Sequence, residues 1–182
     1  MALAALILSA VALLLVVLVA LAILELLVQR PAGDQEPPDA IEEFDLASGA
    51  EGALASSLGL PRALDDLPSR LVLVVSPMCA ACHRLVASFE GVVPEHVLVL
   101  VSAANPARLR QWSAAAGLPH DEIVFDDDMA VVNSLGVTSS PAAVGFVRGR
   151  AAFGVNVSGR GALDALVSQR LDIDVAPPSG EE

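Results

Sequence analysis

"LVLVVSPMCAACHR", residues 71–84, is the stretch from which we predict the fold of this chain. Its first five residues, 71–75, form an uninterrupted apolar run rich in valine, which is typical of a strand buried on both faces of a sheet. The two cysteines of the 182-residue chain, Cys79 and Cys82, follow this run three positions apart. Because the apolar spacing after them is helical, we expect a helix from about residue 79 to residue 90.

The remainder of the chain alternates between strand-like and helix-like patterns. The predicted elements, in chain order, are a strand at 97–101, a helix at 106–116, a strand at 123–125, a helix at 129–136, a hairpin around Arg148 and Gly149, and a helix that opens at 158–161. Residues 41–46 are expected to add an edge strand, and residues 50–60 a short helix. This order predicts an α/β domain with a mostly parallel central sheet, helices on both faces and an antiparallel edge from the hairpin.

The N-terminal segment is far more apolar than the rest of the chain. Residues 2–24 contain no charge and one polar residue, Ser9, and are long enough as a helix to cross a bilayer. A cleaved signal peptide is the alternative, with small residues at Ala20 and Ala22, but the run lacks a basic start and continues beyond that point. We therefore predict a transmembrane anchor over residues 1–28.

The other domain boundaries follow from composition. Residues 29–40 are rich in proline and acidic side chains, which predicts a linker. Residues 41–172 form the predicted globular domain, and residues 173–182 a flexible tail. The net charge is -12 and all 10 basic residues are arginine, so nucleic-acid binding, which requires basic clusters, is not expected.

The predicted map places Cys79 just past the carboxyl end of a parallel strand, where the active sites of α/β sheets gather. It also lies in the first turn of a helix, whose free N–H groups and dipole favour a thiolate and lower the thiol pKa. Cys82 lies one turn deeper. We expect Cys79 to attack a disulfide and Cys82 to resolve the resulting mixed disulfide.

His83 lies four residues after Cys79, on the same face of the predicted helix. Two interpretations are open. The side chain is either an imidazolium that stabilises the Cys79 thiolate or a solvated surface histidine without a part in the chemistry. The sequence does not fix the direction of the ring.

Three ordered motifs carry a resemblance to a known family. They are "LVLVVSPMCAAC", "IVFDDDMAVVNSLGV" and "TSSPAAVGFVRGR", and together they span roughly residues 70–155. The chain resembles thioredoxin-fold proteins, specifically the membrane-tethered branch of TlpA-like and MauD-like thiol-disulfide proteins. This resemblance implies a thioredoxin-like central mixed sheet flanked by helices, with residues 123–136 as the insertion of that branch.

The resemblance also implies a cis-proline opposite the cysteine pair. By position this is Pro141, with Ser140 before it. We therefore expect a site in which the catalytic residues Cys79, Cys82 and Pro141 are supported by Pro77, His83 and Ser140.

The chain departs from the family pattern at three positions. Met78 stands where thioredoxin has a tryptophan, and Leu73 stands where thioredoxin has a buried aspartate. Leu85 occupies the place of a glutamate that some reductive TlpA-like proteins carry. We therefore expect no carboxylate to accept the proton of Cys82.

Other functions use similar residues. A cysteine pair is also half of a zinc site, but His83, His96 and His120 show no paired spacing. A soft-metal carrier, such as a copper carrier of the same fold, needs only the two thiols and is the main alternative. A peroxidase would carry threonine where Ser76 stands, and a non-catalytic module would not need to keep both thiols. We expect no cofactor and no metal, and we interpret the acidic run 126–128 as a helix start.

These features predict a membrane-anchored thiol-disulfide oxidoreductase whose partners are thiol- or disulfide-containing proteins. The resemblance implies a single-pass protein of the cell membrane with its catalytic domain outside the cytoplasm, where a reductant would need a membrane electron donor. Charge beside the predicted anchor does not set its orientation. The direction of electron transfer, and the choice between MauD-like enzyme maturation and TlpA-like cytochrome or oxidase assembly, stay open.

Overall fold

The computed structural model describes residues 41–171. The predicted anchor (1–28), linker (29–40) and tail (173–182) lie outside the described residues. Within 41–171 no helix has both the length and the apolar character that a membrane crossing requires.

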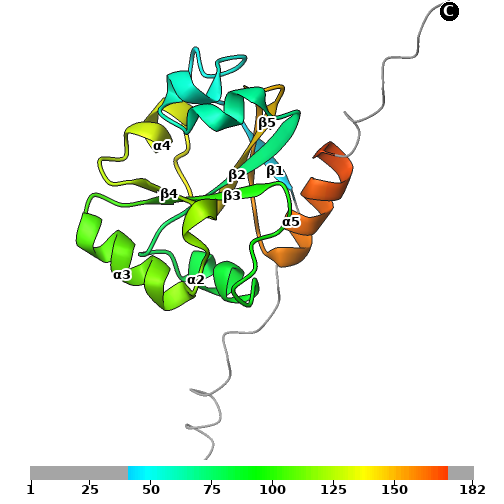
Figure 1. The fold of residues 1–182 in the computed structure, drawn as a ribbon. Coiled ribbons are helices and arrows are strands. Elements are labelled where there is room, and N and C mark those ends of the chain that lie inside the picture. Colours follow the sequence, from blue (N-terminus) through cyan, green and yellow to red (C-terminus); the bar gives the residue numbers. More distant parts are fainter. Residues whose placement is uncertain (1–40, 172–182) are drawn as a thin grey trace, which may run out of the picture. The chain divides into compact units, whose positions relative to one another are not determined.

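A single six-stranded sheet forms the centre of the described domain, with the strand order β1-β6-β5-β2-β3-β4 (Figure 1). The strands are β1 (Glu42–Phe44), β2 (Ser69–Val75), β3 (Val97–Ser102), β4 (Ile123–Asp126), β5 (Ala142–Val147) and β6 (Arg150–Asn156). The helices are α2 (Ala80–Ala87), α3 (Pro106–Ala116), α4 (Ala130–Leu135) and α5 (Arg160–Leu166), which continues as a π-helical turn at Val167–Leu171. Short 3₁₀ helices lie at Ala55–Leu58, Arg62–Asp66 and His120–Glu122.

The sheet is mixed, as the resemblance to thioredoxin-fold proteins implies, and the expectation of a mostly parallel sheet with an antiparallel edge is wrong. β2 pairs with β3, and β3 with β4, in parallel, whereas β5 pairs with β2, β6 with β5 and β1 with β6 in antiparallel orientation. The hairpin β5–β6 therefore lies inside the sheet, beside β2.

The chain between β4 and β5 does not cross the domain. α4 has 6 residues and so spans about 9 Å, whereas the 7 residues of β2 span about 23 Å. After α4 the chain enters β5 at the carboxyl end of β2, where Ala142 pairs with Val74, and β5 therefore runs antiparallel to β2.

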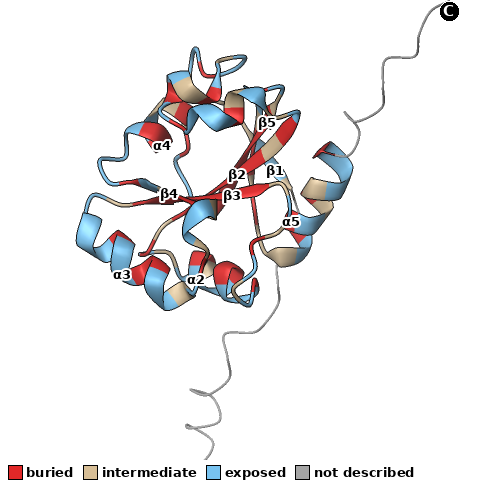
Figure 2. Ribbon diagram, viewed as in Figure 1, coloured by how far each residue is buried: buried red, intermediate tan, exposed pale blue. Residues whose placement is uncertain are grey.

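Alternating side chains of the central strands build a core on each face of the sheet. Leu71, Leu73 and Val75 point into the cluster formed with α2, α3 and α5. Val72 and Val74 point into the cluster formed with α4 and the first two 3₁₀ helices. Figures 1 and 2 show these two helical layers and the buried central strands between them.

Two local boundaries differ from the sequence prediction. Residues 50–60 hold only a 3₁₀ turn, and α2 ends at Ala87, before the predicted boundary.

The buried Asp126 accepts hydrogen bonds from the N–H groups of Val131 and Val132 at 3.2 and 3.0 Å. The acidic run at 126–128 thus starts α4, as predicted, because its carboxylates bind free N–H groups.

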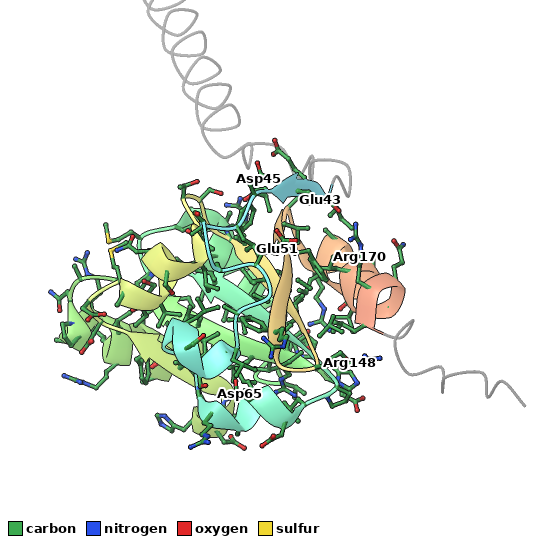
Figure 3. All side chains as sticks on the ribbon, turned by 90° about the horizontal axis from the view of Figure 1, so that it is seen from above. Glu43, Asp45, Glu51, Asp65, Arg148 and Arg170 are labelled. Carbon is green, nitrogen blue, oxygen red and sulfur yellow. The ribbon has the colours of Figure 1, made fainter. Side chains whose placement is uncertain are left out.

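The predicted edge strand is present as β1, next to β6. It is joined to the C-terminal part of the domain by an ion pair between Glu43 and Arg170, both labelled in Figure 3. The Arg170 guanidinium also lies over the Phe153 ring, 5.2 Å from its centroid. Exposed pairs of this kind contribute little to stability, but they connect β1 to the residues that follow α5.

The turn between β5 and β6 consists of Arg148 and Gly149, both with positive φ, at 51° and 70°. Such a two-residue turn matches the twist of the strands it joins. Arg148 donates its N–H to Pro68 O at 2.7 Å, and Gly149 O accepts from Ala55 N at 2.9 Å. The turn therefore packs directly on the segment that precedes β2.

The Gly149→Ala substitution is expected to destabilise the domain more than Gly117→Ala. Both glycines have positive φ, so alanine is strained at either position, but a Cβ at 149 would also overlap the backbone of Asp65, whereas Gly117 has open space. The clash adds roughly 1–3 kcal/mol, which denaturant unfolding of the two variants measures. Equal losses in the two variants would contradict this packing.

Candidate active site

Cys79 is the N-cap residue of α2, immediately after the turn that follows β2. Its φ and ψ are -98° and 115°, so its backbone is still extended when the helix begins. Ser76 stabilises the turn through its backbone and its side chain. Its carbonyl accepts a hydrogen bond from Cys79 N at 3.0 Å, and its hydroxyl accepts one from Met78 N at 3.3 Å. The turn therefore fixes the Cys79 backbone before the side chain makes any contact.

The Cys79 sulfur takes the place that an aspartate or serine oxygen usually takes at a helix start. Sγ accepts the backbone N–H of Cys82 at 3.2 Å, and the thiol donates to the carbonyl of Ser140, also at 3.2 Å. Both cysteines are free thiols; Cys79 is partly exposed, while Cys82 is fully buried. The two sulfurs thus share one helix end but face different surroundings.

These surroundings move the two thiol pKa values in opposite directions. Burial opposes ionisation of Cys79, yet its pKa is lowered, because the Cys82 thiol and N–H, the Ser140 side chain and the Ala81 N–H all donate to the thiolate. For Cys82, burial and the hydrogen bond to Cys79 raise the pKa to about 12. Cys79 is therefore the thiol of the pair that ionises more readily, and Cys82 keeps its proton.

Ser140 and Pro141 reach Cys79 because β5 starts at the carboxyl edge of β2. The peptide bond between them is cis. The Pro141 carbonyl accepts from Val157 N at 3.0 Å, and Ser139 donates its hydroxyl to Asn156 Oδ1 at 2.6 Å. The loop is thus attached to the end of β6, and the Ser140 carbonyl is held against the nucleophile.

The ring of His83 is turned away from the Cys79 sulfur. Nε2 lies 2.9 Å from the carbonyl of Pro77, and the indole Nε1 of Trp112 lies 3.1 Å from each ring nitrogen. Neither nitrogen donates to Cys79, so the direct stabilisation of its thiolate by an imidazolium is not formed. His83 is exposed, as the interpretation of a surface histidine expects, but its ring nitrogens have protein partners.

Buried apolar side chains occupy the two positions at which related proteins carry a carboxylate. Leu73 and Leu85 are 0% and 3% exposed. Within residues 41–171 the one buried carboxylate is Asp126, and its oxygens bind Ser102 and the α4 backbone. Cys82 therefore shares its proton with Cys79 rather than with an acid.

A cleft of about 170 Å³ opens beside the nucleophile. Its lining includes Ser76 and Ser140, which contact Cys79, together with the apolar side chains of Met129 and Val137. Met78, which directly precedes Cys79, is 71% exposed, and its sulfur accepts from Arg108 Nη1 at 2.6 Å. Apolar surface thus lies near the partly exposed Cys79 sulfur.

The described residues contain no group of three or more histidine, cysteine or acidic side chains arranged to hold a metal ion. A soft metal would have the two thiols as its ligands.

The structure brings together all the residues that the sequence analysis places at the site. Pro77 is buried and directly precedes Met78, and its carbonyl is the one bound by His83. Sequence reasoning missed the roles of Ser76 and Trp112. Ser76 stands in the quoted motif, but Trp112 follows Cys79 by a strand and most of a helix, and no local pattern connects it with His83.

No protein-family model and no curated protein matches this sequence. A search of solved structures finds a secreted disulfide oxidoreductase of Mycobacterium tuberculosis homologous to Escherichia coli DsbE, at 16% identity and TM-score 0.47, covering 65% of this chain and 91% of that one. A putative DsbE thiol:disulfide interchange protein from Chlorobium tepidum has 13% identity and TM-score 0.46, with 74% and 99% covered. A putative thioredoxin from Neisseria meningitidis has 20% identity and TM-score 0.44, with 65% and 82% covered.

The two thiols of the reduced, folded protein are expected to react with iodoacetamide at very different rates. With its lowered pKa, Cys79 stays a thiolate to lower pH than an ordinary thiol, and its rate falls as the pH drops through that pKa. Cys82, at a pKa of about 12, has roughly a thousandfold less thiolate near neutral pH than an unperturbed cysteine.

Mass spectrometry after labelling at pH 7 should therefore find one alkyl group, on Cys79. The Cys79→Ser variant provides the control and should remain unlabelled until it is unfolded. Labelling of Cys82 in the folded protein would contradict the assigned order of the two sulfurs.

Proposed function

We propose that this protein is a thiol-disulfide oxidoreductase that uses the Cys79-Ala80-Ala81-Cys82 pair to exchange disulfides with protein partners. The observation that carries the proposal is the position of Cys79 Sγ, 3.2 Å from the Cys82 N–H at the start of α2. A sulfur in that place ionises readily, and a second, protonated sulfur lies beside it. This is the asymmetry that stepwise disulfide exchange needs.

Reduction of a partner proceeds in two balanced steps. The Cys79 thiolate attacks one sulfur of the partner disulfide, forming a mixed disulfide and releasing the other partner sulfur as a thiolate. Cys82 then loses its proton, which the released thiolate accepts, and attacks Cys79 Sγ. The products are the Cys79–Cys82 disulfide and a partner with two reduced sulfurs; the reverse sequence oxidises a dithiol.

The surface around Cys79 is suited to a polypeptide partner. The exposed Met78, next to Cys79 in the chain, and the cleft beside Ser140 offer apolar contacts near a partly exposed sulfur. A small-molecule disulfide needs no such surface. Partners with an accessible disulfide or dithiol in an extended segment are therefore the proposed substrates.

Membrane attachment and position outside the cytoplasm form the second part of the proposal. The uncharged run at residues 2–24, followed by the proline-rich segment up to residue 40, supports the attachment. The position outside the cytoplasm rests on the resemblance to TlpA-like and MauD-like proteins. A single-pass anchor would hold the domain near its partners at the membrane, and a reducing cycle there would draw electrons from a membrane donor. The β4–α4 unit, at the position of the TlpA-like and MauD-like insertion, favours that branch.

The Cys82→Ala variant is expected to accumulate a mixed disulfide at Cys79, because the resolving sulfur is absent. Full-length variants are produced in cells, quenched in acid to stop thiol exchange, and then denatured and alkylated near neutral pH. They are compared on non-reducing gels, with mass spectrometry of the attached protein. The Cys79→Ala variant is the matched control and should trap nothing. Turnover on a protein disulfide should be lost in both.

Equal trapping by the two variants would contradict the assigned roles. Tight copper binding by the two thiols without any disulfide exchange would instead favour the copper carrier. A reporter fused after residue 182 that is active only in the cytoplasm would contradict the proposed orientation.

A further inference from the structure

His83 joins α2 to the turn before it through two separate hydrogen bonds. Its backbone N–H donates to the Cys79 carbonyl at 3.1 Å, as expected within a helix. Its side chain reaches further back, and Nε2 lies 2.9 Å from the Pro77 carbonyl. His83, the fourth of the 8 residues of α2, therefore holds both Cys79 and the turn that precedes it.

Trp112 fixes the direction of the His83 ring. A carbonyl only accepts hydrogen bonds, so Nε2 carries the proton that Pro77 receives. The Trp112 indole Nε1 lies 3.1 Å from both ring nitrogens, and of these only Nδ1 then has a lone pair to accept the indole N–H. The two rings meet edge to face, with centroids 5.5 Å apart and planes at 90°. Trp112 is itself 8% exposed and belongs to the same core cluster as the buried residues of α2. Its side chain is therefore held in place by packing, unlike a surface side chain.

The chain of contacts ends at the nucleophile. Pro77 directly precedes Met78, whose N–H binds the Ser76 hydroxyl, and Cys79 N binds the Ser76 carbonyl at 3.0 Å. A change in the orientation of the Pro77 carbonyl rotates the peptide that leads into this turn. It thereby moves Cys79 Sγ relative to the Cys82 N–H on which its ionisation depends.

We propose that His83 is a positioning residue, which Trp112 orients and which holds the Pro77 carbonyl so that Cys79 stays at the N-cap of α2. This inference rests on the proposed disulfide exchange at Cys79. It differs from the electrostatic interpretation, because it requires the hydrogen-bonding pattern of the neutral imidazole and no positive charge.

Two substitutions separate the alternatives. Lysine at position 83 keeps a positive charge but has no acceptor for the Trp112 N–H, whereas glutamine is neutral and offers one donor and one acceptor. His83→Lys should therefore raise the Cys79 pKa and slow its alkylation at pH 7 by roughly two- to five-fold, the usual size of interactions at a helix N-terminus. His83→Gln should restore most of the wild-type rate.

The measurement is the pH profile of iodoacetamide alkylation of the reduced, full-length protein. His120→Gln, on an exposed 3₁₀ turn, is the matched control and should leave the profile unchanged. Trp112→Phe removes the indole donor and should shift the profile in the same direction as His83→Ala. Combining the two should give less than the sum of their shifts, because both break one chain of contacts.

The inference would be overturned if the pH profile of alkylation were unchanged in His83→Lys but shifted in His83→Gln. That result would show that the positive charge of residue 83, not its hydrogen-bonding pattern, acts on Cys79. Unchanged profiles for both His83→Lys and His83→Ala would also overturn it. If wild-type Cys79 itself titrates as an ordinary thiol and exchanges no disulfide, the proposed function fails instead, so the two failures are distinguishable. A general loss of folding would appear in thermal unfolding and not as a shifted pKa of the folded protein.

Discussion

The hydrogen bond from the Cys82 N–H to Cys79 Sγ is the interaction on which the chemistry of the site depends. It places one sulfur among the free N–H groups that every helix leaves at its start. The other sulfur, one turn further along the same helix, lies in the core. A single short helix therefore produces an ionisable thiol and a protonated one, and within residues 41–171 the groups that shift their pKa values are hydrogen-bonding groups and burial rather than charged side chains of other residues.

The sheet brings the second half of the site to this sulfur. Because the chain after α4 enters β5 beside the end of β2, the Ser140 carbonyl meets Cys79. The same geometry places the apolar cleft between the nucleophile and the start of α4. The β4–α4 unit thus both directs the chain into the hairpin and shapes the surface on which a partner would lie.

α3, on the same face of the sheet as α2, contributes to the site through contacts rather than charge. Trp112 belongs to α3, yet its indole N–H reaches the ring that binds the Pro77 carbonyl. The apolar Leu73 and Leu85 leave Cys82 without a carboxylate partner, so its proton is shared with Cys79. Reduction and resolution in this site are therefore controlled by hydrogen bonds and burial around two sulfurs.

The sequence alone predicted the β2–α2 unit, the cysteine pair and their unequal surroundings, because a buried strand followed by a helix start is a local pattern. It also predicted the hairpin and the capping use of the acidic run, which depend on neighbouring residues. Only the tertiary structure decided the position of β5 inside the sheet, the direction of the His83 ring and its contact with Trp112. These depend on where a short helix leaves the chain and on which side chains from distant segments then meet, and no local spacing encodes such distances.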